Sequence, residues 1–362
     1  MTQQNPLLFA VGPVAMFPET LRIGSQPLPY FRTGEFSQLV LGAEADYLRL
    51  LNAPDGSRAV FLSSSGTGGM DAMVSCILGP EDKALVIDGG GFGHRFVELC
   101  RFYGVAHEVL TLEPGQALQP GMLDEVCMDG FTALLVNLHE TSTGTLYDLN
   151  MLSAFCKKHG LLLMIDAVSA FLCDELDMAA SGADVVLTAS QKALACAPGM
   201  ALLALSQRAQ AKIHATPQRN YYLNLVSALD NGLRGQPPFT LAESVMLQVA
   251  QRLRSLQNGG MEAERQRMRE NASFFRDEIL KRPFALFSQN PALGCTALAV
   301  PEGVSAHELF LVLKDEYNIC VCPNGGALRD KVFRVGHMGN LDRESYLHLL
   351  DAIDDLKRRN LL

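Results

Sequence analysis

The feature that most constrains the fold is an alternation of short apolar runs with longer amphipathic segments. Such an alternation is typical of a mostly parallel sheet that is covered by helices. Six apolar runs stand at 59–65, 84–90, 133–140, 161–168, 184–190 and 201–206. Their hydrophobicity is continuous rather than alternating, which indicates that both faces of the sheet are buried. The sequence therefore predicts an open α/β domain.

The pattern changes in the last third of the chain. A long helical segment at 240–282, interrupted by QNGG, is followed by strand, helix and strand patterns in CTALAVP, SAHELFLVLKDEYN, ICVCPNGG and KVFRVGH. This order predicts a smaller α+β domain, with which the first residues of the chain pack. We expect a large domain at 15–255 and a small domain made of 1–14 and 256–362. They are closely packed, since no low-complexity linker separates them.

Composition excludes several classes of protein. The chain has 362 residues, is 48% hydrophobic and carries a net charge of −9. Its longest block of Lys and Arg is KRR at 357–359, so we expect no binding to nucleic acid or to a membrane surface. The nine cysteines lie mostly in apolar runs and suit a reducing compartment. Without a signal-peptide pattern or an apolar run of about 18 residues, the expected location is cytoplasmic.

A lysine and an aspartate follow two of the apolar runs. Lys192 stands just after the run at 184–190, among small residues and hydroxyls. A buried lysine in such a place can lose its proton and form an imine with an aldehyde. Asp166 stands near the end of the run at 161–168, where a carboxylate would keep a pyridine nitrogen protonated. Together they predict an enzyme that uses pyridoxal 5'-phosphate.

Other strand ends supply the remaining parts of such a site, because ligands of an open parallel sheet bind beyond the carboxyl ends of its strands. SSSGTGGMDA runs from hydroxyls and glycines into a helix. The amides of Gly66 and Thr67, with the hydroxyls of Ser65 and Thr67, therefore predict a phosphate cradle. Phe92 lies on a glycine-rich turn, where its ring can stack on another ring. HETSTG offers hydroxyls to a ring oxygen.

The ordered set of segments resembles the class V (fold type I) aminotransferases, which include alanine-glyoxylate, serine-pyruvate and 2-aminoethylphosphonate-pyruvate transaminases. The resemblance covers nearly the whole chain, from AVGPVAMFPE through SSSGTGGMDA, GGFGHRF, HETSTG, IDAVSA and ASQKALACAPG to FRVGHMGNL. It implies a large domain with a mostly parallel seven-stranded sheet between helices, and a smaller α+β C-terminal domain. It also implies pyridoxal 5'-phosphate as cofactor and a homodimer with shared active sites.

The resemblance assigns roles to single residues. Lys192 would hold the cofactor as an imine and move the proton during catalysis, and Asp166 would pair with the pyridinium nitrogen. Phe92 and Val168 would cover the two faces of the ring. The other implied contacts are those of Thr141 with the ring hydroxyl and those of the phosphate with Ser65, Gly66, Thr67 and Gln191.

Two further residues come from the same resemblance. GQPPFTLAE is similar to the segment by which a partner subunit completes the phosphate site, which nominates Thr240. Arg334 in KVFRVGHMGN matches the arginine that binds the acid group of the substrate. A guanidinium fork suits a carboxylate because two N–H groups meet two oxygens. We expect no metal site, since Cys320 and Cys322 have no further ligands nearby.

The reaction expected is transfer of an amino group from a small amino acid, of the alanine or serine type, to pyruvate or glyoxylate. One alternative is 2-aminoethylphosphonate as donor with pyruvate as acceptor, because a phosphonate fits Arg334 almost as well. A lyase with the same cofactor is another alternative. A non-catalytic protein that binds the cofactor is a third, and the presence of Lys192 and Asp166 argues against it. Gln191 stands where cysteine desulfurases carry histidine, which disfavours desulfuration.

Overall fold

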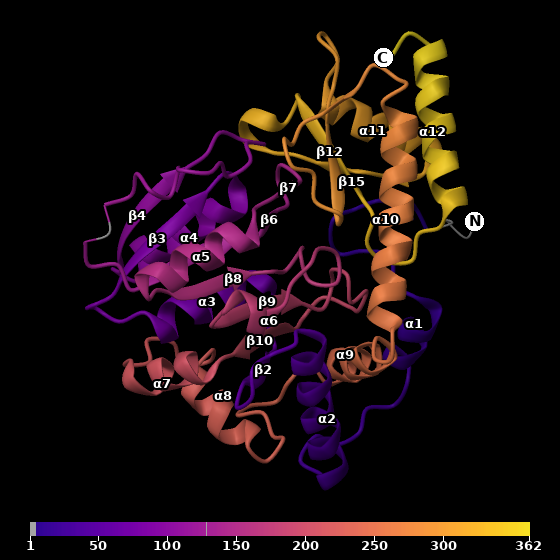
Figure 1. Cartoon of the computed structure of the whole chain (residues 1–362). Helices are drawn as coiled ribbons and strands as arrows, with labels where there is room; N and C mark the ends of the chain where they lie inside the picture. The colour runs from indigo at the N-terminus through magenta and orange to yellow at the C-terminus, as the bar shows by residue number, and fades with distance from the viewer. Residues whose placement is uncertain (1–4, 128) are drawn as a thin grey trace.

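The centre of the molecule is a seven-stranded sheet. In this computed structural model, which describes residues 5–127 and 129–362, the strand order is β2-β10-β9-β8-β5-β3-β4. Neighbouring strands are parallel, except that β10 is antiparallel to both β2 and β9. The prediction of a mostly parallel sheet is confirmed (Figure 1). The strands are β2 Arg58–Leu62, β3 Lys83–Asp88, β4 Ala106–Thr111, β5 Ala133–Asn137, β8 Leu162–Asp166, β9 Val185–Ala189 and β10 Ala201–Leu205.

Six of these strands coincide with the predicted apolar runs, and β4 does not. It lies at the edge of the sheet, where exposed residues recur along AHEVLT, so it lacks a continuous apolar run. The run predicted at 133–140 was also too long as a single strand. After Asn137 the chain leaves the large sheet, and β6 (His139–Glu140) pairs with β7 (Thr145–Leu146) in a small separate ladder.

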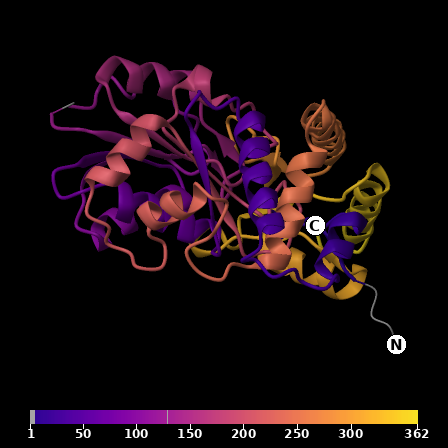
Figure 2. The ribbon, with the colours of Figure 1, turned by 90° about the horizontal axis from the view of Figure 1, so that it is seen from below.

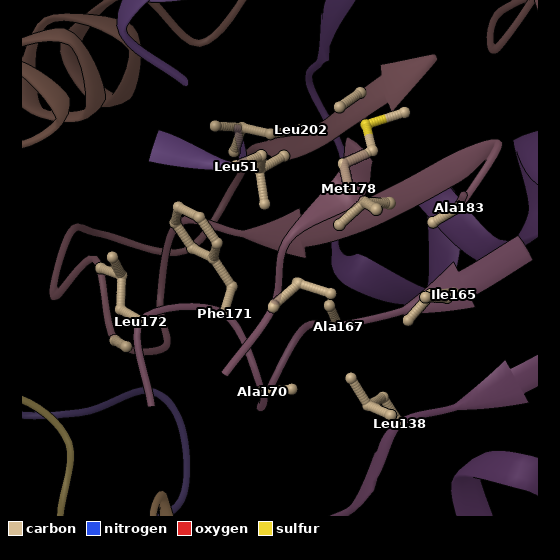
Figure 3. Packing of buried hydrophobic residues seen from close by; sticks show 14 of the residues in the cluster. Leu51, Leu138, Ile165, Ala167, Ala170, Phe171, Leu172, Met178, Ala183 and Leu202 are labelled. Carbon is tan, nitrogen blue, oxygen red and sulfur yellow. The ribbon is translucent and has the colours of Figure 1, made fainter. Parts of the chain in front are cut away.

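Alternate residues of each central strand enter two separate hydrophobic clusters. In β5, Leu134 and Val136 belong to one cluster, and Ala133 and Leu135 belong to the other. Both faces of the sheet are therefore buried, which explains the continuous hydrophobicity of the strands. Figure 3 shows part of the first cluster, with Phe171 packed near Leu51 and Leu202 beside the turn that follows β8.

Helices cover both faces of the sheet. The first cluster contains side chains of α2 (Gly34–Leu50) and α5 (Leu149–His159), and the second contains those of α3 (Gly66–Ile77) and α4 (Gly91–Phe102). Helix α5 is followed by its C-cap Gly160, which adopts the left-handed conformation. The remaining helices of this part are α1 (Pro18–Gly24), α6 (Met178–Ser181), α7 (Gln207–Ala215) and α8 (Leu225–Gly232).

The long helical segment expected at 240–282 is two helices, α9 (Glu243–Ser255) and α10 (Gly260–Ile279), with the break at the predicted QNGG. Helix α9 lies beside α2 (Figure 2), and α10 lies beside the last helix, α12 (Figure 1). The C-terminal sheet has the order β11-β12-β15-β14 and is antiparallel. Its elements and their neighbours are β11 (Ala285–Leu286), β12 (Cys295–Ala299), α11 (Ala306–Tyr317), β14 (Cys322–Pro323), a short 3-10 helix (Gly326–Leu328), β15 (Val332–Gly336) and α12 (Arg343–Arg358).

The start of the chain packs against this C-terminal part. Strand β1 (Leu7–Leu8) pairs in parallel with β13 (Ile319–Cys320), and the ring of Phe9 lies 5.1 Å from that of Tyr346. The expected division into domains at 15–255, and at 1–14 with 256–362, stays a prediction. None of the helices in the described part of the chain is long and apolar enough to cross a membrane.

Candidate functional site

A cavity of about 200 Å³ lies beyond the carboxyl ends of the central strands. The residues that line it are Gly12, Ser65, Gly66, Thr67, Met70, Phe92, Arg95, Asn137, Thr141, Asp166, Val168, Ser169, Gln191 and Lys192. Every predicted contact residue is among them except Thr240 and Arg334. The structure thus brings together, in one cavity, side chains that the sequence spreads from residue 65 to residue 192.

Lys192 is buried, with 8% of its surface exposed, just after β9. Its Nζ donates a 2.6 Å hydrogen bond to the backbone oxygen of Val11, on the N-terminal segment that crosses the site. Burial lowers the pKa of the Lys192 ammonium, because the charged form loses hydration. The next residue, Gly12, has a φ of +130°, and a Cβ there would lie 2.5 Å from Cδ of Lys192. Only glycine leaves room for this lysine.

Asp166 is the last residue of β8 and is almost fully buried. The amide of Val168 donates to Oδ1 at 2.9 Å, and Nδ2 of Asn137 donates to Oδ2 at 2.7 Å. Burial raises the pKa of Asp166 to about 6, although these two donors and the charge of Lys192 oppose the rise. A positive group placed beside this buried carboxyl would stabilise its charged form.

Asn137 lines the cavity, although the sequence did not predict it there. It lies opposite Asp166 in the register of β5 and β8. Its Oδ1 is buried and has no hydrogen-bond partner in the described ranges. The available signal was a single amide at the end of the apolar run ALLVN, where a polar side chain requires a partner.

The turn after β3 carries Phe92 into the cavity. The centroid of its ring lies 6.0 Å from Nζ of Lys192. The guanidinium of Arg95 lies 4.9 Å from the same centroid and donates a 3.0 Å hydrogen bond to Oγ1 of Thr67. Arg95 thus lines the cavity and connects Phe92 to Thr67 at the start of α3.

A buried carboxylate fixes this turn. Glu140 accepts hydrogen bonds from the amides of Phe92 and Gly93, at 3.2 and 2.8 Å, and from the hydroxyl of Ser142 at 2.5 Å. Burial raises the pKa of Glu140, and these donors lower it. Glu140 therefore anchors the first turn of α4 rather than facing the cavity. It stands in HETSTG, the segment whose hydroxyls were expected to meet a ring oxygen.

The start of helix α3 forms the other wall. Ser65 caps the helix, and its Oγ accepts from the amide of Gly68 at 3.4 Å. Gly66 and Thr67 occupy the first turn, whose amides have no acceptor within the helix. A Cβ at Gly66 would lie 2.9 Å from Cγ2 of Val168, so the two walls approach closely there. Gln191 adds a buried Oε1 with no hydrogen-bond partner among the residues described.

Thr141 connects the cavity to the C-terminal sheet. Its hydroxyl donates to Oγ of Ser169 at 2.7 Å, so Ser169, also missed from the sequence, shares this position. Its backbone oxygen accepts a 3.1 Å hydrogen bond from Nη1 of Arg334 on β15. Arg334 also donates to the backbone oxygen of Pro323 at 2.6 Å, while its Nε is buried with no partner in the part of the chain described. Arg334 is not among the residues that line the cavity, but it donates a hydrogen bond to Thr141, which does line it.

Thr240 is exposed and lines a different, shallow groove with Tyr222 and Phe239. It is not among the residues that line the first cavity of its own chain. The roles of Thr240 in a dimer and of Arg334 toward substrate stay predictions.

Comparisons with known proteins identify the family and the fold of the chain. The family Aminotransferase class-V matches residues 30–330 of the chain. The soluble hydrogenase 42 kDa subunit of Anabaena cylindrica is 28% identical, over 96% of this chain and 92% of its own length. The alanine–glyoxylate aminotransferase of Callithrix jacchus is 27% identical, over 96% of this chain and 86% of its own length. The solved structure of an aspartate aminotransferase of subgroup IV from Thermus thermophilus has a TM-score of 0.89 at 27% identity, and the match covers 97% of this chain and 99% of that one.

The predicted fold type I is confirmed by this structural similarity, which extends over nearly the whole molecule. The family match also spans well over half of the sequence and contains most of the cavity lining. The chain therefore belongs to the class V aminotransferases.

Proposed function

We propose that this aminotransferase uses pyridoxal 5'-phosphate to move an amino group from a small amino acid, of the alanine or serine type, to pyruvate or glyoxylate. The observation that carries the proposal is that Lys192 and Asp166 open into one cavity with the first turn of α3. Pyridoxal phosphate requires three kinds of group: an amine for its aldehyde, a carboxyl group for its pyridine nitrogen, and anion-binding amides for its phosphate.

The residues present fit that cofactor. Lys192 would bind its aldehyde carbon and Asp166 its ring nitrogen. Phe92 and Val168 would cover the ring, and Gln191, which lines the same cavity, would donate to the phosphate from the nitrogen of its side-chain amide. The start of α3 would hold the phosphate, with Arg95 adjacent through Thr67. When bound, pyridoxal phosphate supplies the electron sink that weakens a bond at the Cα of the amino acid.

Lys192 has the properties of a nucleophile and proton carrier. Because burial lowers its pKa, a larger fraction of the amine is neutral than in water. The hydrogen bond to the Val11 oxygen holds Nζ at one place in the cavity. The amide of Val168 and the side chain of Asn137 hold the carboxyl group of Asp166 in one orientation. Its charge can therefore act on the ring nitrogen without any movement of the side chain.

The substrate class rests on Arg334 and on a relative. The guanidinium of Arg334 is tied to the cavity through Thr141 and has an unpartnered Nε, which supports a role in binding an acid group. The relative from Callithrix jacchus is named for alanine and glyoxylate, which supports the same pair here. We further propose that the protein is a cytoplasmic homodimer in which Thr240 of one subunit completes the phosphate site of the other.

The test uses purified protein loaded with pyridoxal phosphate. L-alanine, L-serine and 2-aminoethylphosphonate are added one at a time, the visible absorption of the bound cofactor is followed, and glyoxylate or pyruvate is then added. We expect alanine or serine to remove the absorption, and the oxo acid to restore it with the aminated product detected by chromatography.

Each other outcome decides against the proposal in a different way. A response to 2-aminoethylphosphonate alone would replace the donor, and failure of every oxo acid to restore the absorption would favour a lyase. No response to any donor would contradict the enzymatic reading. Lys192→Ala should abolish the response, while Lys281→Ala, which removes an exposed lysine paired with Glu278, should leave it intact.

A further inference from the structure

A second cavity, of about 400 Å³, shares no lining residue with the first. It lies between the loops of the large sheet and helix α10 of the C-terminal part. Its apolar lining includes Leu146, Leu149 and Leu293. Its charged lining includes Asp174, Arg265 and Arg269. The cavity therefore combines charges of both signs with apolar surface at the junction of two packing regions.

Asp174 is the buried acidic group of this cavity, with 6% of its surface exposed. Its Oδ1 accepts the amide of Leu293 at 2.9 Å. Its Oδ2 is buried and has no hydrogen-bond partner within residues 5–127 and 129–362. Burial raises the pKa of Asp174 to about 7, although the positive charges of Arg276 and Arg265 oppose the rise. A buried carboxyl oxygen without a donor is costly unless a ligand supplies one.

The nearest ring does not supply that donor. Nδ1 of His139 lies 3.6 Å from Oδ2 of Asp174, but it also lies 3.0 Å from the backbone oxygen of Ser169. A carbonyl oxygen accepts a hydrogen bond only from a ring nitrogen that carries a hydrogen. The hydrogen on Nδ1 of His139 therefore points to the oxygen of Ser169 and not to Asp174. Burial lowers the pKa of His139 to about 3, so the ring is neutral. Its Nε2 then accepts from the thiol of Cys295 at 3.5 Å.

The basic groups of the cavity are also weakly paired. Arg265 and Arg269 both approach the exposed carboxylate of Glu262, at 3.5 and 3.8 Å, and Arg269 donates to Oε1 of Gln266 at 2.7 Å. Nε of Arg265 is buried and has no hydrogen-bond partner in the described part of the chain. Among the described residues that line the cavity, three buried polar atoms thus lack a hydrogen-bond partner: Oδ2 of Asp174, Nε of Arg265 and the hydroxyl of Tyr147, which lies close to Gly89.

We propose that this cavity is a second binding site, for a small zwitterion such as an α-amino acid. The ammonium group donates to Oδ2 of Asp174, and the carboxylate accepts from Arg265 and Arg269. A simple cation would lie close to two arginines, and a simple anion would meet Asp174 together with the exposed Asp148 and Glu175. A molecule that carries both charges avoids both repulsions. Because α10 and the loops of the large sheet both contribute, the ligand ties the two regions together.

The experiment uses the full chain loaded with pyridoxal phosphate and L-proline as probe. Proline carries both charges, but its secondary amine is not an ordinary amino donor. Binding is measured by calorimetry at neutral pH while the cofactor absorption is recorded. Pyrrolidine and cyclopentanecarboxylate, which each lack one charge, are titrated in parallel. We expect proline to bind with no change of the absorption, and both analogues to bind at least about tenfold more weakly.

Variants assign the binding to this cavity. Asp174→Asn keeps an acceptor for the amide of Leu293, and Arg269→Gln changes an exposed side chain, so both should fold. Each should weaken proline binding by at least about tenfold. Glu270→Gln, an exposed change on the same helix outside the cavity, is the matched control and should have no effect.

Three results would overturn the proposal. They are no heat of binding with proline, unchanged affinity in both Asp174→Asn and Arg269→Gln, or a change of cofactor absorption on binding, which would place proline in the first cavity. A failure of the donors to transfer an amino group would leave this test standing, because proline binding does not depend on turnover.

Discussion

Asn137 donates a 2.7 Å hydrogen bond from its Nδ2 to Oδ2 of Asp166, which lies directly opposite on the neighbouring parallel strand. The amide of Val168 occupies the other carboxyl oxygen. Together they give the buried carboxyl group a single orientation toward the cavity. Because the group is buried, each missing donor leaves an oxygen unsatisfied.

Asn137→Ala should therefore weaken the binding of pyridoxal phosphate by about tenfold, which corresponds to roughly 1.4 kcal/mol. Asn137→Asp should weaken it more, since a second carboxylate beside Asp166 raises the pKa of the pair. Absorption titrations of the apoprotein with the cofactor measure both. Equal affinity of wild type and Asn137→Asp would show that Asp166 does not contact the cofactor.

Gly12→Ala should reduce both cofactor loading and activity by at least about tenfold, because the new Cβ would overlap Cδ of Lys192 in a backbone conformation with φ of +130°. Gly104→Ala is the matched control. Gly104 has φ of +63° with no atom within 4 Å of its Cβ position, so that variant bears only the backbone cost. If the two variants lost the same activity, the close approach to Lys192 would have no part in the effect.

Phe92→Ala should weaken cofactor binding by roughly 1 kcal/mol or more, since it removes a ring that can stack in the cavity. Phe92→Tyr keeps the aromatic face and should retain most of the affinity. Dissociation constants from fluorescence titration separate the two. Loss of affinity in Phe92→Tyr equal to that in Phe92→Ala would contradict a stacking role.

The pH dependence of stability should report Asp174. Its pKa is about 7 in the folded protein and near the ordinary value of 3.8 when unfolded, so the folded state binds its proton more tightly. Stability therefore falls as pH rises through the window between those two values, by at most roughly 1.4 kcal/mol for each unit by which the pKa values differ.

Asp174→Asn removes this contribution. The stability of the variant relative to wild type should rise with pH across that window and stay level above it, as measured by urea unfolding of the apoprotein at several pH values. Asp166, whose pKa is raised to about 6, is present in both proteins and cancels in the difference. A difference that did not change with pH would mean that the carboxyl of Asp174 is not buried in a low-dielectric place.

The sequence predicted those parts of the molecule that leave a local pattern. The central strands are buried on both faces and read as apolar runs, while β4, exposed at an edge, left none. Asp166 ends a strand, and Lys192 and Phe92 follow strands, so all three could be placed at one edge of the sheet. Asn137 and Glu140 act through pairings across the sheet and across a turn, which spacing along the chain does not reveal.

The residues of the second cavity could be predicted from the sequence even less well. Asp174 and Arg265 are ninety-one positions apart and meet only because α10 packs over the loops that follow the central strands. Neither residue lies in a segment that resembles a family motif. Their relationship depends on tertiary packing, so it could be found only in the structure.

The most direct test of the central claim is to locate the lysine that bonds to the cofactor. The protein loaded with pyridoxal phosphate is reduced with borohydride, which makes any lysine–cofactor bond permanent, then digested and mapped by mass spectrometry. The account predicts the phosphopyridoxyl group on Lys192 and on no other lysine. Its attachment to another lysine, or its absence from a protein that had taken up the cofactor, would contradict the account.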